Sequence, residues 1–139
     1  MITQDLQPCS LIHRMQPDFL QNLQKYEFDI FKFSNRVGRK MQMPLIAFGL
    51  LYANHLQDTV DQKKYLNFVK SIYNRYQRGV QYHNDLHGSD VAQHVSYMLK
   101  QQKIKDLGFN DLDVLSLIVA SLSHDVGHDG FTNGYHLQT

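Results

Sequence analysis

Residues 110–128 read NDLDVLSLIVASLSHDVGH, and this stretch decides the fold. Asn110 or Asp111 is predicted to cap a helix that runs to about Asp125. The helix is apolar almost all round, which is typical of a helix buried in a protein core. Its C-terminal end would then deliver His124 and Asp125 into the centre of an all-α domain.

The rest of the chain also favours helices. No stretch alternates apolar and polar residues over a useful strand length, and no internal repeat occurs. Apolar residues follow helical spacing over 45–56 and 65–76. Pro44 is predicted to occupy the first turn of the earlier helix, and Ser34–Lys40 to form a loop or a short turn. The other predicted caps are Asp58 or Thr59 for the second helix and Ser89 or Asp90 for a later one.

The chain is predicted to hold one domain over 19–139, preceded by an irregular segment over 1–18. The segment 1–18 is mixed in polarity and contains Pro8 and Pro17. A buried central helix needs partners on every side, yet few helices follow it. The predicted fold is therefore a compact all-α, multi-helix domain that is truncated at its C-terminal side.

Composition excludes several classes of function. Among 139 residues, 14 are Lys or Arg and 13 are Asp or Glu, so no basic excess favours a nucleic-acid partner. The single cysteine, Cys9, rules out an intrachain disulfide and a cysteine-based zinc site. The most apolar runs, 44–53 and 112–122, are shorter than the roughly 20 residues that span a bilayer. We therefore expect a soluble, cytoplasmic chain without a membrane segment.

Two histidine clusters carry the functional signal. His83 and His87 are four residues apart and would share one face of a helix. In the second cluster, Asp125 follows His124 directly, and His128 lies one turn further on. A carboxylate at the end of an apolar helix is costly to bury unless a cation accompanies it. Imidazole nitrogens with a carboxylate oxygen suit a divalent metal, and the pattern indicates metal-assisted hydrolysis of a phosphate ester.

A simpler interpretation exists for each cluster. His83 and His87 would make only hydrogen bonds at a helix start, and His124 to His128 would form an exposed polar tail of the long helix. The two clusters together favour the metal site, because each supplies ligands that the other lacks.

The two clusters resemble the metal motifs of the class I 3′,5′-cyclic nucleotide phosphodiesterases. Residues 82–91, YHNDLHGSDV, resemble the first motif, and residues 124–133, HDVGHDGFTN, resemble the second. The segment 28–31 also resembles the opening of that catalytic domain, and the resemblance covers about 19–139. It implies a helical, HD-type metal-dependent phosphohydrolase domain, of which this chain is the N-terminal part.

The resemblance implies two divalent metal ions. His87, His124 and Asp125 would hold a tight, zinc-type ion together with one Asp from further along the family's catalytic domain. Asp125 would bridge to a second ion, magnesium or manganese, which is otherwise held by waters. Gly127 and Asp129 depart from the residues that are common at these positions.

The resemblance also implies roles in the reaction. His83 would be the general acid that protonates the 3′ oxygen, and His128 would lie near the water of the second metal. Tyr82, His83 and Asp125 would contact the substrate, while Asp90 would orient a ligand histidine or cap a helix.

The sequence thus predicts hydrolysis of cyclic AMP or cyclic GMP to the 5′ monophosphate, in cyclic nucleotide signalling. The chain ends before the family's fourth metal ligand, its purine-binding glutamine and its aromatic clamp, and any dimer would form through regions that are not present. The alternatives are a general HD-type phosphohydrolase and a truncated, weakly active or inactive metal-binding relative.

Overall fold

The protein is helical along its length. The structure is a computed structural model that describes residues 1–3, 6–15 and 17–138, and these residues contain no strand. In chain order the helices are α1 (Pro8–Ile12), α2 (Pro17–Leu23), α3 (Ile30–Val37), α4 (Arg39–Ala53), α5 (Gln62–Arg75), α6 (Asp85–Leu99), α7 (Gln102–Lys105), α8 (Asp111–Ser123) and α9 (Asn133–Gln138). The all-α prediction is confirmed.

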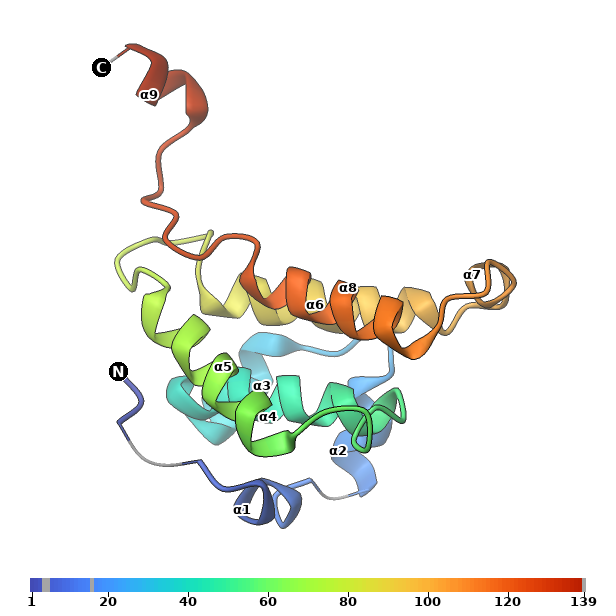
Figure 1. Cartoon of the computed structure of the whole chain (residues 1–139). Coiled ribbons are helices and arrows are strands. Elements are labelled where there is room, and N and C mark those ends of the chain that lie inside the picture. Colours follow the sequence, from blue (N-terminus) through green and yellow to red (C-terminus); the bar gives the residue numbers. More distant parts are fainter. Residues whose placement is uncertain (4–5, 16, 139) are drawn as a thin grey trace.

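The core is built around α4. Every residue from Gln42 to Leu51 is buried, and α4 packs against α2, α3, α5 and α6. In Figure 1, α6 and α8 lie side by side across this group, joined at their far ends by α7. The start of α6 therefore meets the end of α8, and this is where both histidine clusters lie.

Helix α8 begins where the sequence predicts. The side chain of Asn110 accepts hydrogen bonds from the backbone N–H of Leu112 at 2.9 Å and of Asp113 at 3.1 Å. The Asp113 carboxylate accepts in return from the N–H of Asn110 at 3.0 Å. This reciprocal capping box fixes the first turn of α8.

The prediction that α8 is buried all round is wrong. Only Ile118, Ser121 and Leu122 are buried, whereas Leu112 remains 67% exposed and Leu117 38% exposed. An apolar helix can be buried on every side, but α6, α4 and α5 cover only part of the surface of α8 among the described residues. The apolar outer face of α8 agrees with the predicted incompleteness of the fold.

The loop or short turn predicted at Ser34–Lys40 is reduced to a single residue. Helix α3 continues to Val37, and α4 starts at Arg39 with a single residue between the two helices. That residue, Gly38, has φ +87°, a conformation that glycine adopts without steric cost. One glycine is therefore enough to turn the chain between the helices.

Pro44 lies inside α4 and not in its first turn. Proline lacks the N–H that would bond to the carbonyl of the residue four positions earlier. That residue is Lys40, which is exposed.

Two other predicted helix starts are displaced. The cap of α5 is Asp61, whose side chain accepts from the N–H of Lys64 at 3.0 Å, and the cap of α6 is Asn84. Several polar residues near each start are able to cap a helix, so local pattern alone does not choose among them. The incorrectly predicted caps were Asp58, Thr59, Ser89 and Asp90.

The N-terminal segment is more ordered than predicted. Residues 1–18 were expected to be irregular, but α1 forms at Pro8–Ile12 and α2 starts at Pro17; residues 4–5 and 16 lie outside the described residues. Each proline stands at a helix start, where its missing N–H costs nothing. Leu11 is buried in the core, and this burial holds α1 in place.

None of the helices in the described part of the chain combines the length and the apolar character needed to cross a membrane.

Candidate metal centre

The cap of α6 positions the first histidine cluster. The Asn84 side chain accepts from the N–H of Leu86 at 3.0 Å and of His87 at 3.3 Å. Its amide donates back to the carbonyls of Val80 and Gln81, both at 3.0 Å. One buried side chain thus starts the helix and holds the preceding loop against it.

This cap places His83 before the helix, so the predicted i, i+4 pair on one helix face is wrong. His87 occupies the first turn of α6, while His83 lies on the loop. The two rings nevertheless lie close together, with centroids 5.8 Å apart. The loop therefore brings His83 close to His87, as a shared helix face was predicted to do.

The end of α8 positions the second cluster. His124 follows the last residue of α8, and its Nδ1–H donates to the carbonyl of Ser121 at 2.7 Å. A carbonyl only accepts, so the proton of a neutral His124 ring sits on Nδ1. The lone pair of Nε2 is left to bind a metal, which is the usual way in which a second hydrogen bond orients a histidine ligand.

Three side chains converge on one point between α6 and α8. His87 Nε2 and His124 Nε2 lie 3.3 Å apart, and Asp125 Oδ2 is 3.5 Å from the first and 3.2 Å from the second. Zinc bound at roughly 2.0–2.1 Å in a tetrahedron holds its ligand atoms about 3.3 Å apart. The donor types and their separations therefore fit a divalent ion of this kind.

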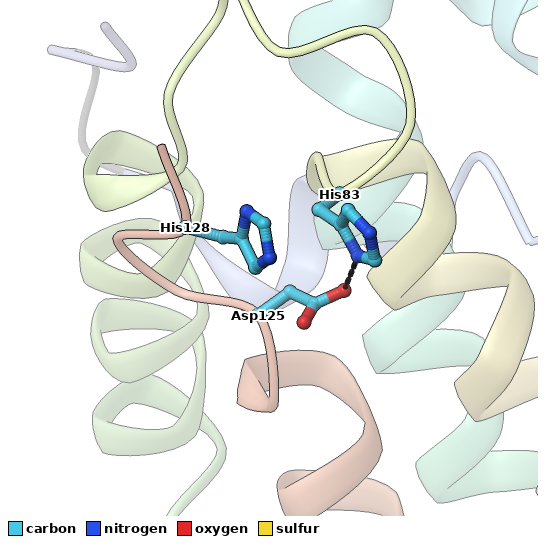
Figure 2. Close-up of side chains that lie close together, drawn as sticks. All are labelled: His83, Asp125 and His128. Atoms are coloured by element: carbon cyan, nitrogen blue, oxygen red, sulfur yellow. Dashed lines mark hydrogen bonds and ion pairs between the residues drawn. The ribbon is translucent and has the colours of Figure 1, made fainter. Parts of the chain in front are cut away.

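Asp125 also belongs to a second group, with His83 and His128 (Figure 2). His83 Nδ1 hydrogen-bonds to Asp125 Oδ2 at 2.8 Å, and the rings of His83 and His128 stack with centroids 4.0 Å apart. The N–H of Gly130 donates to His128 Nδ1 at 2.9 Å. Neutral His128 therefore carries its proton on Nε2, which suits it to donate a hydrogen bond and not to bind a metal.

Proteins of a known family resemble this chain in the region that forms the site. Residues 82–139 match the model of the family described as 3′5′-cyclic nucleotide phosphodiesterase. This region belongs to that family. It contains all the predicted site residues, from Tyr82 to His128.

Relatives match most of the chain. The chain is 32% identical over 118 residues to the probable 3′,5′-cyclic-AMP phosphodiesterase pde-4 of Caenorhabditis elegans, covering 84% of this chain and 17% of the relative. It is 32% identical over 126 residues to the dual specificity calcium/calmodulin-dependent 3′,5′-cyclic nucleotide phosphodiesterase 1B of Mus musculus, covering 86% and 23%. It is 29% identical over 122 residues to the rod cGMP-specific 3′,5′-cyclic phosphodiesterase subunit alpha of Canis lupus familiaris, covering 86% and 14%. The chain thus spans less than a quarter of the length of each of these phosphodiesterases.

The charge state of the phosphodiesterase motif residues suits metal binding. Partial burial acts to raise the pKa of Asp125, but the hydrogen bond from His83 and three nearby imidazoles outweigh it and lower the pKa. Burial lowers the pKa of His87, and the neighbouring His124 lowers it further. Ionised carboxylate and neutral imidazole are the forms that bind metal ions.

Tyr82 lies beside the two histidines of the first cluster. Its ring lies 4.5 Å from that of His87 and 5.0 Å from that of His83, centroid to centroid. Tyr82 and His83 also line a surface cleft whose other wall includes Gly130 and Phe131. Of the histidines of the site, His83 lines this cleft.

Asp90 does not cap a helix, because it lies in the second turn of α6. Its carboxylate is 3.5 Å from His94 Nδ1, and it exerts only a weak electrostatic effect on His87. Of the two roles that were left open for Asp90, the cap is excluded.

An ion pair that the sequence did not predict anchors the start of α6. The buried Asp85 carboxylate accepts from Arg39 Nε at 2.7 Å and from the Arg39 terminal nitrogen at 2.6 Å. Gln42 donates to the same carboxylate at 2.9 Å. Asp85 lies within the first motif, but its partners come from α4, so no short-range pattern reveals the pairing.

Proposed function

We propose that this chain supplies the metal-binding centre and the proton donor of a 3′,5′-cyclic nucleotide phosphodiesterase. The reaction is hydrolysis of the bond to the 3′ oxygen, which yields the nucleoside 5′ monophosphate. The observation that carries the proposal is the meeting of His87, His124 and Asp125 at one point, with His83 bonded to the same carboxylate.

The proposal includes two divalent ions. His87, His124 and Asp125 would hold a zinc-type ion, because they offer two imidazole nitrogens and one carboxylate oxygen at suitable separations. As the resemblance implies, Asp125 would be shared with a second ion, magnesium or manganese, that is otherwise held by waters, since such ions commonly keep several waters and bind through one or two carboxylates. When bound, the ions would activate water and neutralise charge on the phosphoryl oxygens.

His83 is proposed as the general acid. Its Nδ1 bond to Asp125 orients the ring and leaves Nε2 as the proton-carrying atom for a substrate. The side chain is 39% exposed, so a ligand has access to it. Protonation of the departing 3′ oxygen avoids the release of a free alkoxide.

His128 and Tyr82 would complete the surroundings of the phosphate. The Nε2–H of His128 would donate a hydrogen bond to a water or phosphoryl oxygen, because its Nδ1 is occupied by Gly130. Tyr82 would contact the substrate from the cleft that it shares with His83.

The proposed substrates are cyclic AMP and cyclic GMP. The relatives are named for cyclic AMP, for both nucleotides or for cyclic GMP, so the feature that they share is the cyclic phosphodiester and not the base. A cytoplasmic location is part of the proposal, and the free, exposed Cys9 is compatible with a reducing compartment.

Paired alanine variants test these roles. The protein is incubated with cyclic AMP or cyclic GMP in the presence of zinc and magnesium, and the product is identified by phosphorus NMR. His83→Ala should abolish formation of the 5′ monophosphate and leave bound zinc unchanged, whereas Asp125→Ala should lose both.

The outcomes separate the alternatives. Equal loss of zinc in the two variants would refute the assignment of His83 as proton donor. Zinc binding without any hydrolysis by the unmodified protein would favour an inactive metal-binding relative. Hydrolysis of non-cyclic nucleotides alone would favour a general HD-type phosphohydrolase.

A further inference from the structure

A buried tyrosine hydroxyl lies between the two helices that carry the metal-binding side chains. Tyr76, which follows the end of α5, is only 4% exposed. Its O–H donates to the carbonyl of Leu122 in the last turn of α8 at 2.9 Å. This hydroxyl is therefore hydrogen-bonded to the backbone two residues before His124.

Helix α6 has a glycine, Gly88, where it contacts this hydroxyl. A Cβ atom on Gly88 of α6 would lie 2.6 Å from the Tyr76 oxygen and 3.0 Å from the carbonyl of Leu122. Only a residue without a side chain fits at this crossing. Gly88 directly follows His87, so the contact that fixes the spacing of α6 and α8 is one residue from a proposed ligand.

We propose that Tyr76 is a positioning residue for the metal centre, and this inference rests on the proposed metal-binding function. The hydrogen bond from its hydroxyl fixes the backbone at the end of α8, just before His124. The close contact at Gly88 fixes the distance between α6 and α8, and with it the distance from His87 to His124. The 3.3 Å separation between the Nε2 atoms of His87 and His124 follows from these two constraints. Partners of this kind outside the ligand shell commonly change metal affinity about 10–100-fold when they are removed.

The chain offers a matched control in the helix that precedes Tyr76. Tyr65 in α5 is 6% exposed, and its O–H donates to the carbonyl of Ala47 in α4 at 3.1 Å. Tyr65→Phe removes the same kind of hydrogen bond as Tyr76→Phe, but it does so away from the histidines. Similar losses of stability are expected in the two variants, since each loses one buried hydroxyl bond to a backbone carbonyl.

The experiment is a calorimetric titration of the protein and both variants with Zn²⁺, alongside circular dichroism and thermal unfolding. Tyr76→Phe should weaken Zn²⁺ binding by about tenfold or more, while Tyr65→Phe should change it by less than about twofold. The absorption spectrum of bound Co²⁺ should also change in Tyr76→Phe and not in Tyr65→Phe, because it reports ligand geometry.

A glycine pair repeats the test if Tyr76→Phe does not fold. Gly88→Ala should weaken Zn²⁺ binding, whereas Gly49→Ala, which crowds Leu23 and Phe19 at the contact between α4 and α2, should only destabilise the protein. Wild-type affinity in a folded Tyr76→Phe or Gly88→Ala protein, or equal loss in the paired controls, would overturn the positioning role. Failure of the unmodified protein to bind Zn²⁺ would overturn the metal centre itself and this inference with it.

Discussion

Helices α4 and α8 are both rich in apolar residues, but they occupy different environments. Every residue from Gln42 to Leu51 in α4 is buried by helices on several sides. On α8, only Ile118, Ser121 and Leu122 are buried. The two proposed ligands His124 and Asp125 nevertheless follow α8 and not α4. Helix α4 therefore contributes mainly to the stability of the fold, and the end of α8 carries proposed metal ligands.

The largest expected effect is a difference in stability between equivalent truncations in the two helices. Leu51→Ala in α4 should lower the free energy of unfolding by about 2–5 kcal/mol, because it leaves a cavity in a closely packed core. Leu112→Ala in α8 should change it by less than about 0.5 kcal/mol, since that side chain is largely exposed. Urea unfolding measures both, and equal losses would contradict the contrast between the helices.

A second prediction concerns the link between α4 and the start of α6. Arg39→Met leaves the buried Asp85 carboxylate without its cation, and should lower the free energy of unfolding by roughly 1–3 kcal/mol. The double variant Arg39→Met/Asp85→Asn removes the charge as well and should recover part of the loss. If the double variant is as unstable as the sum of the single variants, the ion pair does not anchor α6.

The smallest effect is a dependence on pH that involves α8. Burial raises the pKa of Tyr76 to about 12, above its ordinary value of 10.0. Because the folded-state pKa is the higher one, the contribution of the hydroxyl is fully present below pH 10 and is lost as the pH rises through about 12. The difference in unfolding free energy between the unmodified protein and Tyr76→Phe should therefore shrink from pH 10 upward. If this difference in unfolding free energy stays constant between pH 8 and 11.5, folding does not raise the pKa of Tyr76.

The contrast between α4 and α8 also shows what the sequence was able to predict. Helical periodicity and the Asn110 cap were sufficient for the all-α fold and for the start of α8, since both depend on residues close together in the chain. The same local information did not reveal which faces of α8 have partners. Coverage depends on helices that are distant in sequence, whereas the α5 and α6 caps were misplaced because several nearby polar residues are able to cap each helix.

The same distinction between local and distant information applies to the candidate site. Its residue types were all recognisable from two short motifs, and the structure brings His83, His87, His124, Asp125 and His128 together. The groups that orient them were missed because their partners lie far away in the chain. Tyr76 was interpreted as part of an apolar stripe, and the carboxylate of Asp85 pairs with a residue of α4. A polar atom on an apolar helix face was the only signal for Tyr76.

The most direct test of the account is a Zn²⁺ titration of the unmodified protein beside Asp125→Ala. Asp125 is common to both groups of ligand-type residues, so its loss should remove tight Zn²⁺ binding while the helical circular dichroism spectrum is retained. The account predicts one saturable tight site in the unmodified protein and none in the variant. Indistinguishable binding by the two proteins would contradict the assignment of the metal centre to His87, His124 and Asp125.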